Sequence, residues 1–120
     1  MNTNDNVPLR GEIWHVNFDP TVGTEIQKTR PAVVISSDGI GRLPIRLVVP
    51  ITAWKDAFTG NIWHVRVDPD SHNGLTKTSA IDTLQVRGVD VQRFGHRIGR
   101  INAPTLEEVV AALAAITEYQ

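Results

Sequence analysis

The sequence predicts a mainly β domain, built as a small, strongly bent antiparallel sheet or partly open barrel with one helix at its C-terminal end. Short apolar segments follow one another from Glu12 to Ile101, with Gly, Pro or Asp between many of them. The apolar spacing changes to a helical period only beyond Ile101. At 120 residues, the chain is long enough for a single domain with one core.

Seven segments are predicted to be strands. Glu12–Phe18 and Asn61–Val67 alternate between apolar and polar residues, as strands with one buried face do. Ala32–Ile35 is continuously apolar, which indicates burial on both faces. Pro50 predicts that its strand bends or lies at a sheet edge. The seven segments are Glu12–Phe18, Ala32–Ile35, Ile45–Ile51, Asn61–Val67, Ser79–Leu84, Gln85–Val91 and His96–Ile101.

The first and fourth segments are near copies of each other, IWHVNFDP and IWHVRVDP. A duplicated half-domain would explain them, but their flanks share no further similarity. Two strands with the same task, each ended by an Asp-Pro turn, are the favoured interpretation. The tryptophans at equivalent positions, Trp14 and Trp63, are expected in the core.

One helix of about four turns is expected at the end of the chain. Thr105 and Glu108 fit a capping box at its start. Its apolar stripe, expected to face the sheet, consists of Leu106, Val109, Val110, Leu113 and Ile116.

Composition excludes several classes of protein. There is no cysteine, so disulfides, thiol nucleophiles and thiolate metal sites are excluded, and a reducing cytosol is expected. No apolar run approaches the roughly 20 residues of a membrane span. Residues 1–9 lack the features of a signal peptide and are expected to form a disordered lead-in to one domain at 10–120.

The 12 basic residues nearly balance the 13 acidic ones, and the arginines between Val86 and Arg100 favour a solvated face over a polyanion site.

The stretch from Gly23 to Ser37, GTEIQKTRPAVVISS, joins a polar loop that is expected to be mobile to a buried strand. Pro31 pushes the preceding Arg30 into extended geometry. Arg30 is therefore a fixed positive charge where the loop meets the strand, and chemistry is often placed at such junctions.

Few catalytic templates fit the sequence, because it has no Gly-rich phosphate loop, nucleophile elbow or paired-histidine metal motif. The histidines are expected at the surface and not as metal ligands; they are His15, His64, His72 and His96. A bent sheet could instead bring together polar residues at the ends of apolar strands. These candidates are Glu25, Arg30, Thr52, Ser79, Asp82, Gln85 and Arg87.

Three stretches, DPTVGTEIQKTRPAVVISS, VVPIT and LQVRGVD, resemble the MazF/PemK family of toxin endoribonucleases from bacterial toxin–antitoxin pairs, and the resemblance runs from Arg10 to Tyr119. It implies a small SH3-like barrel with a C-terminal helix, a homodimer, and cleavage of single-stranded messenger RNA without a metal or other cofactor. The implied products are a 2′,3′-cyclic phosphate and a 5′-hydroxyl. It also implies an antitoxin whose acidic, disordered tail fills the RNA groove, and it allows for operator-DNA binding by the complex.

By the same resemblance, Arg30 matches the family's catalytic arginine and Thr52 its active-site Ser/Thr. The planar guanidinium can hold two phosphate oxygens, and the hydroxyl can add a further hydrogen bond. Glu25 matches an acidic loop position that some members use as a base. Leu84 stands where the family commonly has a carboxylate, and Asp82 lies two residues earlier on the same strand face. The identity of the base stays open between Glu25 and Asp82.

RNA is expected to bind through backbone charge and base stacking. The expected contacts are Lys28, Arg46, Arg66 and Arg87 for the backbone, Trp54 and Phe58 for stacking, and Ser79 and Gln85 as polar neighbours. Two other classes stay open. One is a toxin of the same fold that traps DNA gyrase without cutting RNA, and the other is a plain SH3-like interaction module.

Overall fold

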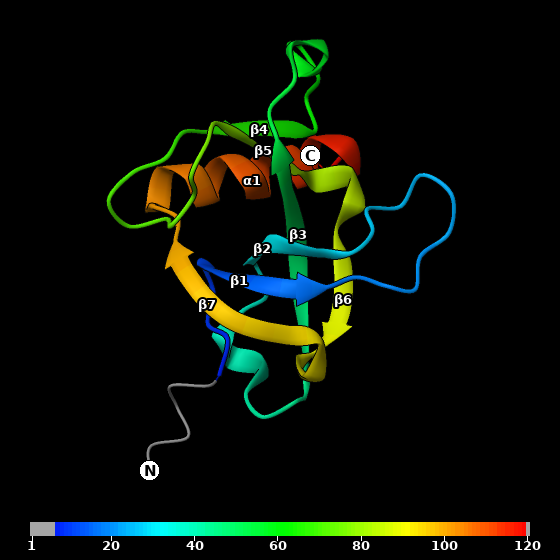
Figure 1. The fold of residues 1–120 in the computed structure, drawn as a ribbon, viewed down its shortest axis with the longest axis vertical. Coiled ribbons are helices and arrows are strands. Elements are labelled where there is room, and N and C mark those ends of the chain that lie inside the picture. Colours follow the sequence, from blue (N-terminus) through cyan, green and yellow to red (C-terminus); the bar gives the residue numbers. More distant parts are fainter. Residues whose placement is uncertain (1–6, 120) are drawn as a thin grey trace.

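The structure is a computed structural model that describes residues 7–119, and within them seven strands form a mainly antiparallel sheet that does not close into a complete barrel (Figure 1). One helix ends the chain, so the predicted fold class is confirmed. The elements are β1 (Glu12–Asn17), β2 (Thr29–Val34), β3 (Ile45–Ala53), β4 (His64–Val67), β5 (Ser79–Asp82), β6 (Arg87–Asp90), β7 (Phe94–Arg100) and α1 (Ala103–Ile116). The sheet order is β4-β5-β3-β2-β1-β7, and β6 also pairs with β3.

Strand β3 lies at the centre of the sheet. It pairs with β2 through Val48–Pro50. Its other edge pairs with β6 through Ile45–Val48 and then with β5 through Ile51–Ala53. Pro50 lies between these two ladders, where a missing backbone N–H is tolerated. The expectation that this strand runs along a sheet edge is therefore wrong.

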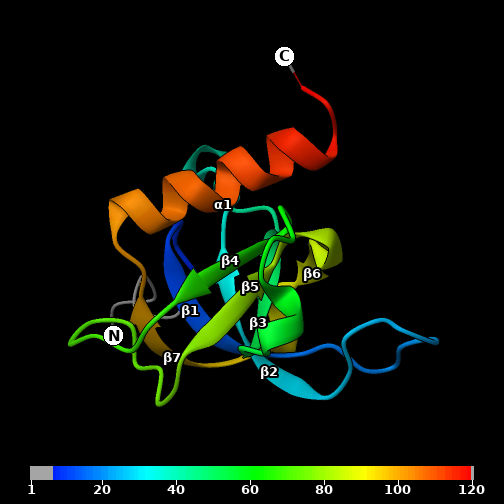
Figure 2. The ribbon, with the colours of Figure 1, turned by 90° about the horizontal axis from the view of Figure 1, so that it is seen from above.

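The sheet buries apolar side chains on both faces. Ile13, Val33 and Ile51 belong to a cluster that includes Val109 of α1, which lies across one side of the sheet (Figure 2). A second cluster on the other face is formed by Trp14, Val16, Phe18, Ala32, Val34, Val48 and Val89. Since β2 contributes to both clusters, the prediction that it is buried on both faces is confirmed.

The two near-copies in the sequence have different surroundings. Trp14 on β1 is buried in the second cluster, as expected. On β4, Val65 and Val67 belong to the α1 cluster, on the opposite face of the sheet. Trp63 precedes β4 and is only partly buried, so its predicted place in the core is wrong. The similar segments thus serve opposite sides of the sheet, which fits two separate strands better than a duplicated half-domain.

Helix α1 begins earlier than the sequence indicated. Asn102 is its N-cap, and its side chain accepts a hydrogen bond of 2.8 Å from the Thr105 N–H. The predicted capping box at Thr105 and Glu108 is therefore wrong by one turn, because Asn102 already satisfies the N–H group that a cap must reach. Val110 is exposed and not part of the buried stripe. Within residues 7–119, no helix is long and apolar enough to cross a membrane.

The structure describes residues 7–9 of the lead-in predicted at residues 1–9. Residues 1–6 lie outside the described residues, but Leu9 is tied to the domain because its N–H donates to Glu12 Oε1 at 2.7 Å. The same oxygen accepts from Trp14 Nε1 at 3.1 Å, and Oε2 accepts from Arg97 Nη1 at 2.8 Å. Burial raises the pKa of the Glu12 carboxyl, but the hydrogen bonds from Leu9, Arg97 and Trp14 and the charge of Arg97 outweigh burial and leave the pKa below its ordinary value.

A Glu12→Gln variant tests this network. A lowered pKa means that the ionised carboxylate contributes stability above its ordinary pKa, and that this contribution is lost as the pH falls through the folded-state value. We expect the variant to unfold about 1–3 kcal/mol more easily than the wild type at pH 7, with a smaller difference below about pH 4. Urea unfolding at both pH values measures the effect. The exposed Glu107→Gln is the control, and equal stability of the Glu12 variant and the wild type at pH 7 would contradict the account.

Candidate active site

Arg30 and Thr52 lie on the same face of the sheet. Ala32 of β2 is directly opposite Pro50 of β3 in the ladder, so these two side chains share a face. Arg30 precedes Ala32 by two residues and Thr52 follows Pro50 by two, and alternate residues of a strand point the same way. Pro31 lies between Arg30 and Ala32 on β2, and Ile51 lies between Pro50 and Thr52 on β3. Both point to the face that α1 covers. The two residues matched to the family's catalytic pair therefore share the face opposite α1.

Strands β5 and β4 extend this face. Thr52 pairs with Ala80, and Ala80 in turn pairs with Arg66. Two residues along β5, Asp82 pairs with His64 of β4. Cross-strand neighbours are about 5 Å apart and diagonal ones about 7–8 Å, so long side chains on this face can reach a common ligand.

A cavity of about 360 Å³ adjoins this face. Its lining is Phe18, Thr24, Glu25, Ile26, Pro50, Leu84, Gln85, Val86 and Arg87. Pro50 lines the cavity and precedes Thr52 by two residues on β3. The polar groups of the cavity thus come from the β1–β2 loop and from the segment that follows β5.

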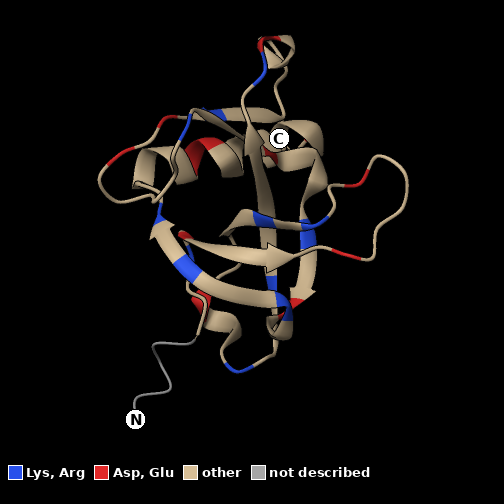
Figure 3. Cartoon of the chain, viewed as in Figure 1, with Lys and Arg blue, Asp and Glu red and all other residues tan. Residues whose placement is uncertain are grey.

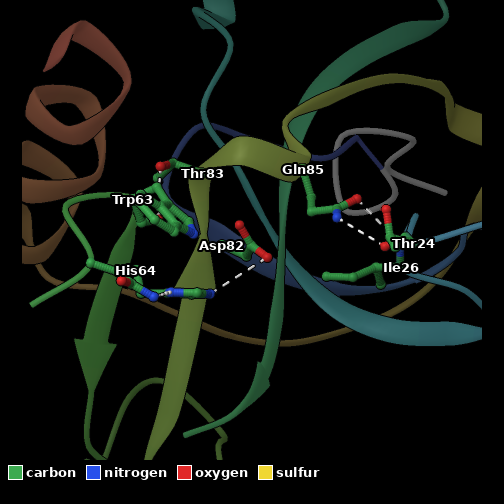
Figure 4. A network of polar contacts seen from close by, with 8 residues as sticks. Thr24, Ile26, Trp63, His64, Asp82, Thr83 and Gln85 are labelled. Atoms are coloured by element: carbon green, nitrogen blue, oxygen red, sulfur yellow. Dashed lines mark hydrogen bonds and ion pairs between the residues drawn. The ribbon is translucent and has the colours of Figure 1, made fainter. Parts of the chain in front are cut away.

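Gln85 holds the β1–β2 loop in place. Its Oε1 accepts from the Ile26 N–H at 3.2 Å, and its Nε2 donates to Thr24 O at 3.2 Å, as Figure 4 shows. Between these two anchors, Glu25 is exposed, and its Oε1 accepts from the Val22 N–H at 2.7 Å. The loop is at the surface, as predicted, but the two hydrogen bonds of Gln85 hold its backbone in place. Because both ends of the Gln85 amide are engaged, this residue positions the loop and is not a free RNA contact.

Most arginines near the site are committed to intramolecular hydrogen bonds. Arg87 Nη1 donates to Phe18 O at 2.8 Å, and Arg93 Nη1 donates to the carbonyls of Asn17 and Asp19. Arg30 uses only its Nε, which donates to Gln27 O at 3.2 Å. Within residues 7–119, its two terminal nitrogens make no hydrogen bond, so they can receive a ligand.

Charge is unevenly distributed over the molecule. Figure 3 shows basic residues on β6 and β7, and acidic residues on α1 and in the loop between β1 and β2. Lys28, at the end of that loop, is exposed and has a left-handed backbone with φ of 69°. The side chain of Lys28 therefore remains available as a contact for a polyanion.

Asp82 and His64 form a buried pair, shown in Figure 4. His64 Nε2 lies 3.6 Å from Asp82 Oδ2, and the two side chains are 7% and 16% exposed. His64 Nδ1 lies 3.3 Å from Nδ2 of Asn61. Asp82 Oδ1 is buried without a hydrogen-bond partner in the described part of the chain. Burial raises the pKa of the Asp82 carboxyl, against a smaller lowering by the charge of His64 and the N–H groups of Leu84 and Gln85.

The loop between β3 and β4 carries the two aromatic residues predicted to stack on RNA. Phe58 stacks on the His64 ring, with ring centres 3.8 Å apart and planes inclined by 15°. Trp54 meets Phe58 edge-on at 5.7 Å. The Arg66 guanidinium lies over Trp54, 5.6 Å from the ring centre, and Arg66 Nε is 3.6 Å from Asp68. Both aromatics thus rest on side chains of β4.

Three expectations need correction. Arg46 is only 6% exposed, and its guanidinium donates to backbone carbonyls, so it holds the chain together and is not available at the surface. Its four acceptors are the carbonyls of Pro8, Gly41, Leu43 and Ile45. Ser79 is 4% exposed and donates to Lys77 O at 2.8 Å, so its hydroxyl is not available either. The expectation that His64 is a surface residue is also wrong.

His64 and Asn61 were not predicted from the sequence to be site residues. Alternation placed His64 on the same strand face as Arg66, but the sequence contains no signal that β4 pairs with β5 in the register that sets His64 beside Asp82. Among residues 7–119, no group of three His, Asp or Glu side chains is placed to hold a metal ion.

Comparison with known proteins gives a consistent match. The chain matches the family described as "PemK-like, MazF-like toxin of type II toxin-antitoxin system" over residues 9–117. It is 34% identical to endoribonuclease PemK of Escherichia coli over 113 residues, covering 89% of this chain and 80% of that protein. It is 34% identical to endoribonuclease MazF9 of Mycobacterium tuberculosis over 110 residues, covering 87% of this chain and 91% of that protein.

Solved structures share the fold. MazF from Deinococcus radiodurans superposes with a TM-score of 0.76 at 24% identity, covering 93% of this chain and 97% of that one. An endoribonuclease from mycobacterial species, solved in complex with its cognate antitoxin, has a TM-score of 0.74 at 16% identity, covering 95% and 98% of the two chains.

The structural assignment of Arg46 is testable with Arg46→Met. Removing a buried guanidinium leaves several carbonyls without donors, so we expect the free energy of unfolding to fall by at least about 2 kcal/mol. Urea unfolding measures the loss. Arg42→Met, at an exposed arginine in the connection that precedes β3, is the matched control and should stay within about 0.5 kcal/mol of the wild type. An unchanged unfolding midpoint for Arg46→Met would show that these hydrogen bonds do not hold the loop.

Proposed function

Because the chain belongs to the PemK-like, MazF-like family of toxins of type II toxin–antitoxin systems, we propose that it is an endoribonuclease toxin that cuts single-stranded RNA on the face shared by Arg30 and Thr52. Its relatives PemK, MazF9, ChpB and EndoA are all named endoribonucleases. The observation that supports this site best is the register of β2 and β3: Ala32 is opposite Pro50, and strand alternation from this pair favours one face for Arg30 and Thr52. A gyrase-binding toxin or a plain interaction module is not favoured, since neither accounts for these relatives.

The residues suit cleavage by the ribose 2′-hydroxyl. In this reaction the 2′-oxygen attacks the neighbouring phosphorus, a base takes the 2′-proton, and the 5′-oxygen leaves with a proton. The products are a 2′,3′-cyclic phosphate and a 5′-hydroxyl. Negative charge builds up on the phosphate oxygens as the bond to the 2′-oxygen forms. The terminal nitrogens of Arg30 can donate to two of these oxygens, and the Thr52 hydroxyl can donate to the same group.

Glu25 is the better placed of the two carboxylates to act as the base. Its side chain is exposed at the mouth of the cavity, and the loop that carries it is fixed by Gln85. In contrast, one oxygen of Asp82 faces His64 and the other is buried. A base must reach the proton that it takes, so accessibility favours Glu25. Leu84, which replaces the carboxylate common in the family, is 57% exposed and lines the same cavity.

The partners follow from the same family. A related endoribonuclease has been solved with its cognate antitoxin, and we propose an antitoxin partner for this chain as well. An acidic, disordered tail would complement the open guanidinium of Arg30 and the exposed Lys28, and would compete with RNA for this face. Homodimer formation belongs to the same proposal. Binding of operator DNA by the complex stays a prediction.

Replacing Arg30 by Ala tests the site. Loss of a preorganised donor to the transition state typically lowers the rate by about 10²–10³, so we expect Arg30→Ala to lose cleavage to that extent and to keep the wild-type unfolding midpoint. Cleavage of a long RNA in EDTA, followed by primer extension and analysis of the product ends, measures the activity. Arg42→Ala, at an exposed arginine in the β2–β3 connection, should cut like the wild type. Full activity of a folded Arg30→Ala protein would rule out this site, and no cleavage by the wild type would rule out the function.

A further inference from the structure

The buried His64–Asp82 pair has no part in the reaction described above. It lies at the base of the β3–β4 loop, where Asp82 is opposite His64 in the β4–β5 ladder. Burying two ionisable side chains is costly unless they serve each other or a ligand. The question is therefore whether the pair takes part in proton transfer or supports a neighbouring part of the site.

The geometry argues against proton transfer by His64. Both ring nitrogens have neighbours, Asp82 Oδ2 at 3.6 Å on Nε2 and Asn61 Nδ2 at 3.3 Å on Nδ1. One face of the ring is covered by Phe58, and only 7% of the side chain is exposed. A general acid or base needs a nitrogen that can reach the substrate, and His64 has none free.

Asp82 is closed off as well. Its Oδ2 faces His64, its Oδ1 is buried, and the N–H groups of Leu84 and Gln85 act on the same carboxyl. The position of the carboxylate therefore suits holding His64 better than receiving a proton from a ribose.

What the pair does contact is the aromatic loop. Phe58 lies nearly parallel to the His64 ring at 3.8 Å, and Trp54 meets the edge of Phe58. Trp54 is only two residues beyond Thr52, so this aromatic group adjoins the proposed phosphate site. Arg66, two residues after His64 on β4, lies over Trp54. Alternate residues of β4 thus each support one aromatic ring of the loop.

We propose that His64 is a positioning residue for RNA binding: Asp82 fixes the His64 ring, and the ring holds Phe58 so that it is ready to stack against a base next to the scissile phosphate. This inference rests on the proposed function, because it assumes single-stranded RNA as the ligand. Stacking of a base on an aromatic side chain changes affinity by about 5- to 150-fold, and a ring that is already held in place loses less entropy on binding.

The inference separates the role of the ring from that of the charge. In His64→Ala the support of Phe58 is lost, so RNA should bind about 5- to 150-fold more weakly, while kcat stays within about threefold of the wild type. In the double variant His64→Phe/Asp82→Leu, an aromatic ring remains beneath Phe58 and both ionisable groups are gone. Replacing a buried ion pair by apolar side chains of similar size is often neutral for stability. This double variant should bind and cut RNA within about threefold of the wild type.

Binding is measured separately from cutting, with a fluorescein-labelled 2′-O-methyl RNA oligonucleotide of mixed sequence as the probe in fluorescence polarisation. This probe cannot be cleaved, because its 2′-oxygens are blocked. Phe58→Ala should weaken binding as much as His64→Ala, and the two changes together should be no worse than Phe58→Ala alone. His72→Ala, at an exposed histidine, is the control and should bind like the wild type.

Two results would overturn the inference. A loss of kcat by about 10² or more in His64→Phe/Asp82→Leu, with the fold intact by circular dichroism, would place the pair in the chemistry. Wild-type affinity of His64→Ala or of Phe58→Ala for the probe would show that the ring stack does not serve binding. If His64→Ala fails to fold, the double variant and Phe58→Ala still decide between these outcomes. Failure of the wild type to cut unmodified RNA would count against the proposed function, whereas the polarisation measurements test the stack by themselves.

Discussion

The pairing of β3 with three other strands is the constraint on which the rest of this structure depends. One edge of β3 pairs with β2, and the other passes from β6 to β5 at Pro50. Because side-chain direction alternates along a strand, a shift of one residue in either register would turn Thr52 toward the α1 cluster. The apolar residues on both faces of the sheet fix the register. The core therefore determines the positions of the polar residues at the site.

The arginines of this chain differ in what their guanidinium groups contact. Arg46, Arg87 and Arg93 donate to backbone carbonyls of loops, and Arg97 is paired with the buried Glu12. Each of these guanidinium groups replaces hydrogen bonds that the chain would otherwise make to water. Arg30 differs, since among residues 7–119 only its Nε makes a hydrogen bond, to Gln27 O. Several arginines of the sequence are thus structural, whereas the arginine at the loop–strand junction is the one that we propose for phosphate binding.

Much of the fold follows from local pattern, because alternation and proline spacing are properties of neighbouring residues. The junction at Arg30 was predictable for the same reason. The burial of Arg46 was not predictable. Its acceptors are backbone carbonyls of the surrounding loops and of Pro8, and every residue has a carbonyl, so no residue type signals them. The His64–Asp82 contact depends on the pairing of strands whose residues here lie 18 positions apart in the sequence, which is a property of the sheet. Choosing Glu25 over Asp82 required burial, which the order of residues does not give.

A crystal structure of the protein with a 2′-O-methyl RNA oligonucleotide is the most direct measurement of the central claim, that strand register brings one guanidinium and one hydroxyl to the same phosphate. We expect one phosphate within about 3 Å of both the Arg30 terminal nitrogens and the Thr52 hydroxyl, with the adjacent 2′-oxygen turned toward Glu25. RNA bound to another surface, with Arg30 and Thr52 both in solvent, would contradict it.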